Sequence, residues 1–102
     1  KNPHITYRDE TNEDLKYSYY NGTAWITMTL DGGTYNVGEY TSIVLDSSNM
    51  PHITYYNQTS ADLMYMFFDG YNWKKTLVYG TNSVGKHTSI DLSRIRGSFF
   101  GI

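Results

Sequence analysis

The pentapeptide Pro-His-Ile-Thr-Tyr occurs twice in this chain of 102 residues, at residues 3–7 and again at residues 51–55. The match continues without a gap, because PHITYRDETNEDLKYSYYNGTAW aligns with PHITYYNQTSADLMYMFFDGYNW 48 residues later. A second pair, VGEYTSIVL at residues 37–45 and VGKHTSIDL at residues 84–92, follows at a spacing of 47 residues. A fixed period of this length indicates a repeat architecture, in which each copy is one structural unit.

Each unit has the composition of strands and turns. The chain is 17% aromatic, with eleven Tyr, and β-branched and aromatic residues favour strands. We expect strands at residues 41–46, 51–56, 62–68 and 73–79, separated by turn residues. The strongest hairpin signals are Asn21-Gly22 and Asp69-Gly70, which occupy the same place in the two copies. The sequence therefore predicts an all-β fold.

Four antiparallel strands repeated every 47–48 residues are typical of β-propeller blades. Residues 62–68 alternate large apolar side chains on both faces, so this strand is expected to lie in a sheet that is covered on both sides. We divide the chain into a first blade at residues 1–40 that lacks its first strand, a complete second blade at residues 41–87, and residues 88–102. This last part holds the first strand of a further blade and a tail that departs from the repeat.

Two blades leave sheet faces uncovered, since propellers typically need four to eight. We therefore expect either a homo-oligomer, with three copies forming a six-bladed ring, or neighbouring blades in a longer array. The divergent tail favours the array.

Charge and composition exclude several classes of function. The formal net charge is −2, with eight basic and ten acidic residues dispersed along the chain, so no basic stripe is present for nucleic acid. No apolar run is long enough to span a membrane. The absence of Cys excludes disulfides and thiolate metal sites, and we expect no cofactor.

The repeated polar residues favour structural roles. His4 and His52 occupy equivalent positions in different blades, too far apart to share a metal, and we expect them to pack or hydrogen-bond at strand starts. Asp14 and Asp62 are expected to cap the turn before their strands. No catalytic triad or paired carboxylates can be assembled, so we expect no enzyme and no catalytic or metal-binding residue.

The aromatic residues around the Asn/Asp-Gly hairpins are the candidate binding residues. An indole beside a turn either packs at the rim of a sheet or stacks against the flat face of a sugar, and dense aromatic residues also suit a protein-binding surface. The candidate ligand-binding residues are Trp25, Trp73, Tyr20, Phe68, Tyr17 and Tyr65.

The pattern PHITYxxxTxxDLxYxxxxG, followed by Trp and by VGxxTSIxL, resembles the repeats of prokaryotic extracellular β-propeller proteins. The resemblance implies a secreted or cell-surface location. A looser similarity is to two-blade bacterial fucose-binding lectins, in which three chains form a six-bladed ring that binds sugars between blades. Where that family has Arg and Glu, this chain has Thr6 and Tyr17, and Thr54 and Tyr65.

Together these features predict a non-catalytic extracellular β-propeller scaffold or protein-binding module. The alternative is a lectin-like, carbohydrate-binding two-blade propeller that uses the aromatic residues between its blades. The expected partners are further blades or copies of the chain, and a glycan or a surface protein.

Overall fold

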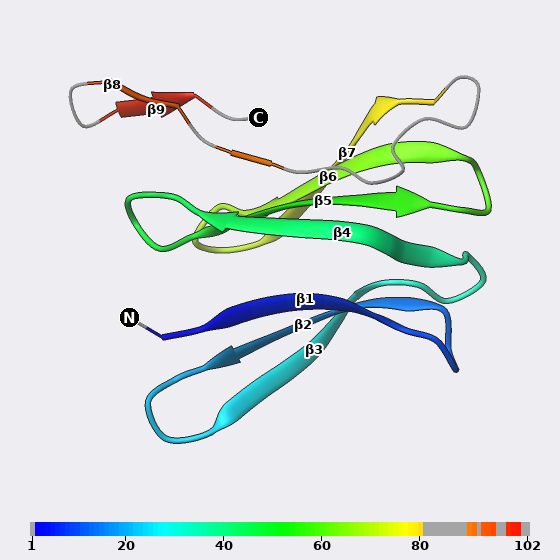
Figure 1. Ribbon diagram of the computed structural model, residues 1–102, viewed down its shortest axis with the longest axis horizontal. Coiled ribbons are helices and arrows are strands. Elements are labelled where there is room, and N and C mark those ends of the chain that lie inside the picture. Colours follow the sequence, from blue (N-terminus) through cyan, green and yellow to red (C-terminus); the bar gives the residue numbers. More distant parts are fainter. Residues whose placement is uncertain (1, 81–89, 92, 96–97, 101–102) are drawn as a thin grey trace.

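A computed structural model describes residues 2–80, 90–91, 93–95 and 98–100, and all their regular structure is β-strand (Figure 1). Every pair of neighbouring strands is antiparallel. The first sheet contains β1 (His4–Asp9), β2 (Asp14–Tyr20) and β3 (Trp25–Asp31) in that order. The second sheet contains β4 (Val37–Leu45), β5 (Pro51–Asn57), β6 (Asp62–Phe68) and β7 (Trp73–Tyr79) in that order. A separate short hairpin consists of β8 (Ser93–Ile95) and β9 (Ser98–Phe100).

The predicted all-β fold is confirmed, and three of the predicted strands agree with the structure to within one residue. The first strand of the second unit is longer than predicted, since β4 begins at Val37 instead of residue 41. Its early part is irregular: the pairing with β5 shifts on either side of Glu39, and Tyr40 has a φ of 54°. Such irregular pairing has no alternating pattern that a sequence would reveal. Three of the six residues of the strand predicted at residues 88–93 lie outside the described residues, namely 88, 89 and 92.

The two hairpins that follow β2 and β6 are closed in the same way. Asn21 Oδ1 accepts hydrogen bonds from the backbone N–H groups of Thr23 and Ala24, at 2.8 and 2.9 Å. Asp69 Oδ1 accepts the two equivalent bonds, each at 2.8 Å. The intervening Gly22 and Gly70 have φ of 99° and 102°, a backbone conformation that residues other than glycine rarely adopt. An Asn or Asp followed by Gly therefore determines the hairpin, as the sequence predicts.

The turns before β2 and β6 correct one prediction. They are capped by Asp9, which accepts bonds from the N–H groups of residues 11 and 12, and by Asn57, which accepts one from Ser60 N–H. Asp14 and Asp62 are not the caps. They pack instead against Gly32 and Gly80, where a Cβ atom would overlap the Asp carboxylate. In both repeats, a glycine directly after the neighbouring strand leaves room for the Asp side chain.

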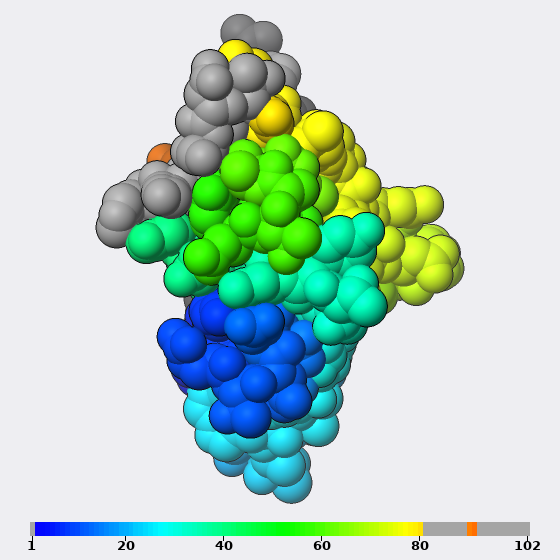
Figure 2. Space-filling view, turned by 90° about the vertical axis from the view of Figure 1, so that its right-hand side faces the viewer, coloured from blue at the N-terminus to red at the C-terminus, as the bar shows by residue number. Residues whose placement is uncertain are grey.

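The two sheets pack face to face, with β1 and β2 beside β4 (Figures 1 and 2). The core that joins them consists of buried apolar side chains from strands of both sheets: Leu15, Val37, Ile53, Tyr55, Met64 and Met66. Burial of these side chains stabilises the packing of the two sheets, at about 25 cal/mol per Å² of apolar surface removed from water.

Asp31, at the end of β3, makes polar contacts with two strands of the second sheet. The Tyr55 hydroxyl donates a hydrogen bond of 2.7 Å to Asp31 Oδ2, and Lys75 Nζ lies 3.4 Å from Asp31 Oδ1. Burial, the hydrogen bond to Asp31 and the charge of that carboxylate all raise the pKa of Tyr55. The hydroxyl therefore remains a donor and fixes β5 against β3.

The two copies of the repeated pentapeptide have very different surroundings. Ile53 and Tyr55 in β5 are fully buried under the first sheet, whereas Ile5 and Tyr7 in β1 are 46% and 38% exposed. Trp25, the equivalent of Trp73, lies on the same exposed face and is 50% exposed. We call Ile5, Tyr7 and Trp25 the outer face of the first sheet.

Candidate ligand site between the sheets

A hollow of about 240 Å³ opens between the two sheets, where the starts of β1 and β5 meet the end of β6. We call it the inter-sheet hollow. Four of its lining residues come from the inner face of the first sheet: His4, Tyr17, Tyr19 and Met28. The others belong to the second sheet and the turn before β5: Asn49, Met50, Pro51, Phe68 and Trp73.

Aromatic rings form most of the walls of the inter-sheet hollow. His4, Tyr17 and Tyr19 are stacked, with ring centroids 5.6–5.9 Å apart and interplanar angles of 12–27°. From the other sheet, Trp73 meets Tyr17 edge-on at 5.4 Å and contacts Phe68 at 5.3 Å. These pairs hold the rings in place, because each has a geometry that aromatic quadrupoles favour.

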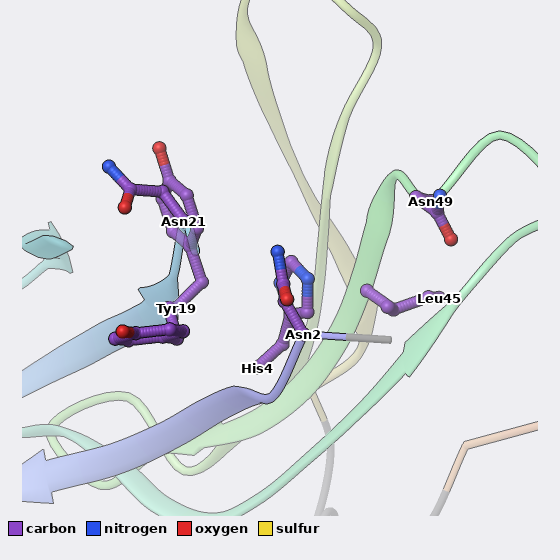
Figure 3. Close-up of a pocket in the computed structure, with 7 residues that line it drawn as sticks. Asn2, His4, Tyr19, Asn21, Leu45 and Asn49 are labelled. Atoms are coloured by element: carbon purple, nitrogen blue, oxygen red, sulfur yellow. The ribbon is translucent and has the colours of Figure 1, made fainter. Parts of the chain in front are cut away.

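A second recess of about 240 Å³ adjoins the inter-sheet hollow and shares His4, Tyr19 and Asn49 with it (Figure 3). The other residues that line this rim recess are Asn2, Tyr20, Asn21 and Leu45. In Figure 3, Tyr19 and Asn21 lie on one side, Leu45 and Asn49 on the other, and His4 and Asn2 between them. Both sheets therefore contribute to the site.

The hydrogen bond between His4 and Tyr17 indicates the protonation state of both side chains. His4 Nδ1 lies 2.7 Å from the Tyr17 hydroxyl. Burial, with a smaller effect from Tyr19, raises the pKa of Tyr17 to about 12, and burial lowers the pKa of His4. A protonated phenol therefore donates to Nδ1 of a neutral imidazole, and Nε2 carries the ring hydrogen. Among the residues that the structure describes, this Nε2 has no hydrogen-bond partner.

The second sheet contains an equivalent group of residues. His52 Nδ1 lies 2.6 Å from the Tyr65 hydroxyl, and the His52 ring stacks on Tyr65 and Phe67. Here Nε2 does have a partner, Asp46 Oδ2 at 2.9 Å. Burial alone would raise the pKa of Asp46, but the bonds from His52 and from the Met50 and Ser48 N–H groups lower it overall. Burial and the charge of Asp46 raise the pKa of Tyr65.

The surroundings of His4 and His52 are also equivalent. Asn2, Tyr19, Tyr20 and Asn21 around His4 correspond by repeat position to Met50, Phe67, Phe68 and Asp69, which line a wider hollow around His52. The same construction therefore occurs once in each repeat.

The structure brings three of the six candidate residues together, since Tyr17, Phe68 and Trp73 all line the inter-sheet hollow. Tyr20 lines the adjoining rim recess. Trp25 lies on the outer face against Tyr20, away from the hollow, and Tyr65 is bonded to His52. The positions where the lectin resemblance places Arg and Glu are engaged internally: Thr6 accepts a bond from Thr41, and Tyr17 bonds to His4.

Sequence reasoning did not include His4, Tyr19 and Asn49 among the candidate residues. The repetition of His at the same position was a signal, but it indicated only a structural role. Asn49 follows a strand by four residues and adopts a φ of 63° in the turn. Only the packing of one sheet on the other places it opposite Tyr19.

The described part of the chain contains no group of three or more His, Asp or Glu side chains arranged to hold a metal ion. It also contains no helix long and apolar enough to cross a membrane. No family model, curated protein sequence or solved structure matches this chain.

Proposed function

We propose that this chain is a non-catalytic, extracellular β-propeller segment, which serves as a scaffold or binding module and whose two sheets are blades of a larger assembly. One observation carries the proposal: Ile53 and Tyr55 are fully buried, while Ile5 and Tyr7 at the same repeat positions are 46% and 38% exposed. An apolar sheet face that is covered in one repeat is the natural docking surface for a further repeat in the other.

The covered face of the second sheet indicates what fits the outer face. Ile53 and Tyr55 pack under the inner face of the first sheet, which contains His4, Leu15 and Tyr17. The second sheet has the same kind of residues on its other face, namely His52, Leu63 and Tyr65. In residue type, that face of a second copy therefore resembles the surface that covers Ile53 and Tyr55, and its Leu63 and Tyr65 side chains are partly exposed, whereas His52 is buried within the chain.

This arrangement is head-to-tail, because the two surfaces that would meet are different. Such contacts generate a closed ring when the rotation per step divides a full turn, and an open array when it does not. Three copies with two sheets each would give a six-bladed ring, and further repeats of a longer chain would give the same contacts. The equivalence of the two sheets supports either form of assembly.

The protonatable groups beside the hollows support a non-catalytic role. Asp46 accepts bonds from His52 and from two backbone N–H groups, and Tyr17 bonds to His4. The bonds to His52, Met50 N–H and His4 are partly buried, and the bond from Ser48 N–H is exposed. Groups engaged in this way hold strands and turns together rather than presenting a base or nucleophile to a substrate.

Association can be tested by light scattering on the purified chain and on Tyr7→Lys, which places a charge on the outer face. Tyr71→Lys is the matched control, because Tyr71 is 88% exposed at the hairpin tip. We expect the chain to associate, Tyr7→Lys to dissociate it to monomers, and Tyr71→Lys to leave it unchanged. A chain that is monomeric at about 100 µM, roughly a hundredfold above a micromolar dissociation constant, would contradict the ring of separate copies and favour neighbouring blades of a longer array. Association that persists in Tyr7→Lys would contradict docking through the outer face.

A further inference from the structure

We propose that Asn21 is a modification site, at which the folded chain loses the side-chain amide to water without an enzyme and gains an aspartate or isoaspartate. Asn21 is the only Asn in the sequence that is followed by Gly. The proposal goes beyond the scaffold function and does not depend on association, because every group that it uses belongs to one hairpin, residues 21–24.

The reaction consists of ring closure followed by hydrolysis, and it needs only water. The backbone nitrogen of Gly22 gives its proton to hydroxide and attacks Cγ of Asn21. A bond forms between these two atoms, and the bond from Cγ to the side-chain nitrogen breaks. That nitrogen takes up a proton and leaves as ammonia, which leaves a succinimide ring in the backbone. Water then opens the ring at either of its carbonyl carbons, giving aspartate or isoaspartate, and nothing is oxidised or reduced.

The hairpin activates the carbon that is attacked. Asn21 Oδ1 accepts hydrogen bonds from the N–H groups of Thr23 and Ala24, at 2.8 and 2.9 Å. Two donors on one oxygen withdraw electron density from Cγ and stabilise the negative charge that Oδ1 acquires as the new bond forms. Among the described residues, the NH₂ group of Asn21 has no hydrogen-bond partner that would hold it back. The side chain is therefore held by its oxygen, while its nitrogen is able to leave.

The attacking nitrogen is accessible. Gly22 is exposed, and a Cβ atom placed on it would meet no atom within 4 Å. Its N–H group donates no hydrogen bond to any residue that the structure describes. Ring closure requires rotation of the backbone beside Asn21, and glycine is the residue that permits the widest range of backbone conformations. The nitrogen can therefore approach Cγ without a hydrogen bond being broken first.

The equivalent hairpin shows that the aspartate product fits. Asp69 Oδ1 accepts the same two bonds, from the N–H groups of Tyr71 and Asn72, each at 2.8 Å. The bonds from Asn72 and Tyr71 lower the pKa of Asp69, so this side chain is ionised at neutral pH. An ionised carboxylate is a poor electrophile and has no leaving group comparable to ammonia. An aspartate at this position therefore keeps the hairpin closed and reacts far more slowly than the amide.

Asn57, which also lies in a turn, is much less suited to the reaction. Its Oδ1 accepts one bond, from Ser60 N–H at 3.2 Å. The nitrogen that would attack belongs to Gln58, and its N–H group donates to the Asn36 carbonyl at 2.8 Å. Attack would require this bond to break, so we expect the reaction to select Asn21.

Peptide mapping by mass spectrometry tests the proposal, using the full chain incubated in mildly alkaline buffer, either folded or unfolded in urea. Asp69→Asn is the matched variant, because it places Asn-Gly in the second hairpin, which has the same two bonds. Asn21→Asp is the chromatographic standard for the aspartate product and should release no ammonia from the first hairpin. Circular dichroism confirms that each incubated variant is folded.

We expect the folded chain to lose the Asn21 amide at no less than about one tenth of the rate of the unfolded chain. Folded Asp69→Asn should lose its new amide within about tenfold of that rate, since its hairpin is equivalent. Slower loss from the folded chain would overturn the proposal, because the hairpin would then protect the amide. A folded Asp69→Asn that keeps its amide, or loss at Asn57 as fast as at Asn21, would also overturn it.

Discussion

The first and second sheets contain the same pentapeptide with opposite environments. In the second sheet, β5 lies between β4 and β6 and every residue from Pro51 to Tyr56 is buried. In the first sheet, β1 is an edge strand, and only its inner-facing side chains approach the other sheet. Because the local sequence is the same, the difference comes entirely from the neighbours of each strand. Burial in a stacked repeat protein is thus determined by position in the stack.

The largest effect on stability should come from truncating a buried side chain in the second copy of the pentapeptide. We expect Ile53→Ala to lower the free energy of unfolding by about 2–5 kcal/mol, since Ile53 is fully buried in the core. Ile5→Ala, at the half-exposed equivalent position, should cost less than about 1 kcal/mol. Urea denaturation of both variants measures the difference. Equal losses would mean that the outer face is covered in solution.

The next effect concerns the hydrogen bond between the sheets. Tyr55→Phe removes the hydrogen bond to Oδ2 of the largely buried Asp31 carboxylate, and we expect a loss of about 1–3 kcal/mol by urea denaturation. Tyr7→Phe is the matched control: the hydroxyl of Tyr7 has only a 3.5 Å contact with Ser18, so its removal should have little effect. If Tyr7→Phe lowered the free energy of unfolding as much as Tyr55→Phe, the two tyrosines would not differ in the way described.

Alkaline pH should destabilise the chain through the buried phenols. Tyr17 has its pKa raised from 10.0 to about 12, so the folded state retains a proton that the unfolded state loses in this interval. Stability should therefore fall as the pH rises from 10 to 12. Thermal melts followed by circular dichroism across this range should show a shallower decline for Tyr17→Phe than for the unaltered chain. An unchanged slope in Tyr17→Phe would exclude this residue as the cause.

The smallest effect is expected at the equivalent hairpins. Asn21→Asp should leave the melting temperature within measurement error, because Asp69 already closes the equivalent hairpin with two bonds of the same length. Asn21→Ala removes the acceptor and should be destabilising by roughly 1 kcal/mol. If Asn21→Asp were as harmful as Asn21→Ala, the two hairpins would not be equivalent.

Much of the fold could be predicted from the sequence, because its signals are local and occur twice. The Asp-Gly and Asn-Gly pairs located the hairpins, and the alternation of β6 indicated a strand covered on both faces. The early part of β4 was missed for a physical reason. At Gly38 the backbone passes so close to Leu15 that a side chain there would meet the backbone of β2. This contact between distant parts of the chain is absent from any local pattern.

The candidate site could be predicted only in part. Aromatic residues beside the hairpins were evident, and Tyr17, Phe68 and Trp73 do meet. Residues at the same repeat position have different surroundings, however. Trp25 contacts Tyr20 on the outer face and has no second sheet against it, whereas Trp73 contacts Tyr17 of the other sheet. The sequence treats these two positions as the same, and only the placement of one sheet on the other distinguishes them.

Because β1 and β5 share the residues His-Ile-Thr-Tyr, amide hydrogen exchange in β1 can serve as the internal reference for exchange in the enclosed strand β5. Intrinsic exchange rates depend mainly on the local sequence, and residues 52–55 repeat residues 4–7. The ratio of protection between paired amides therefore reports directly how much more rarely β5 opens than β1, without a correction for side-chain chemistry. If a further sheet covers β1 at high protein concentration, the two sets of rates should converge.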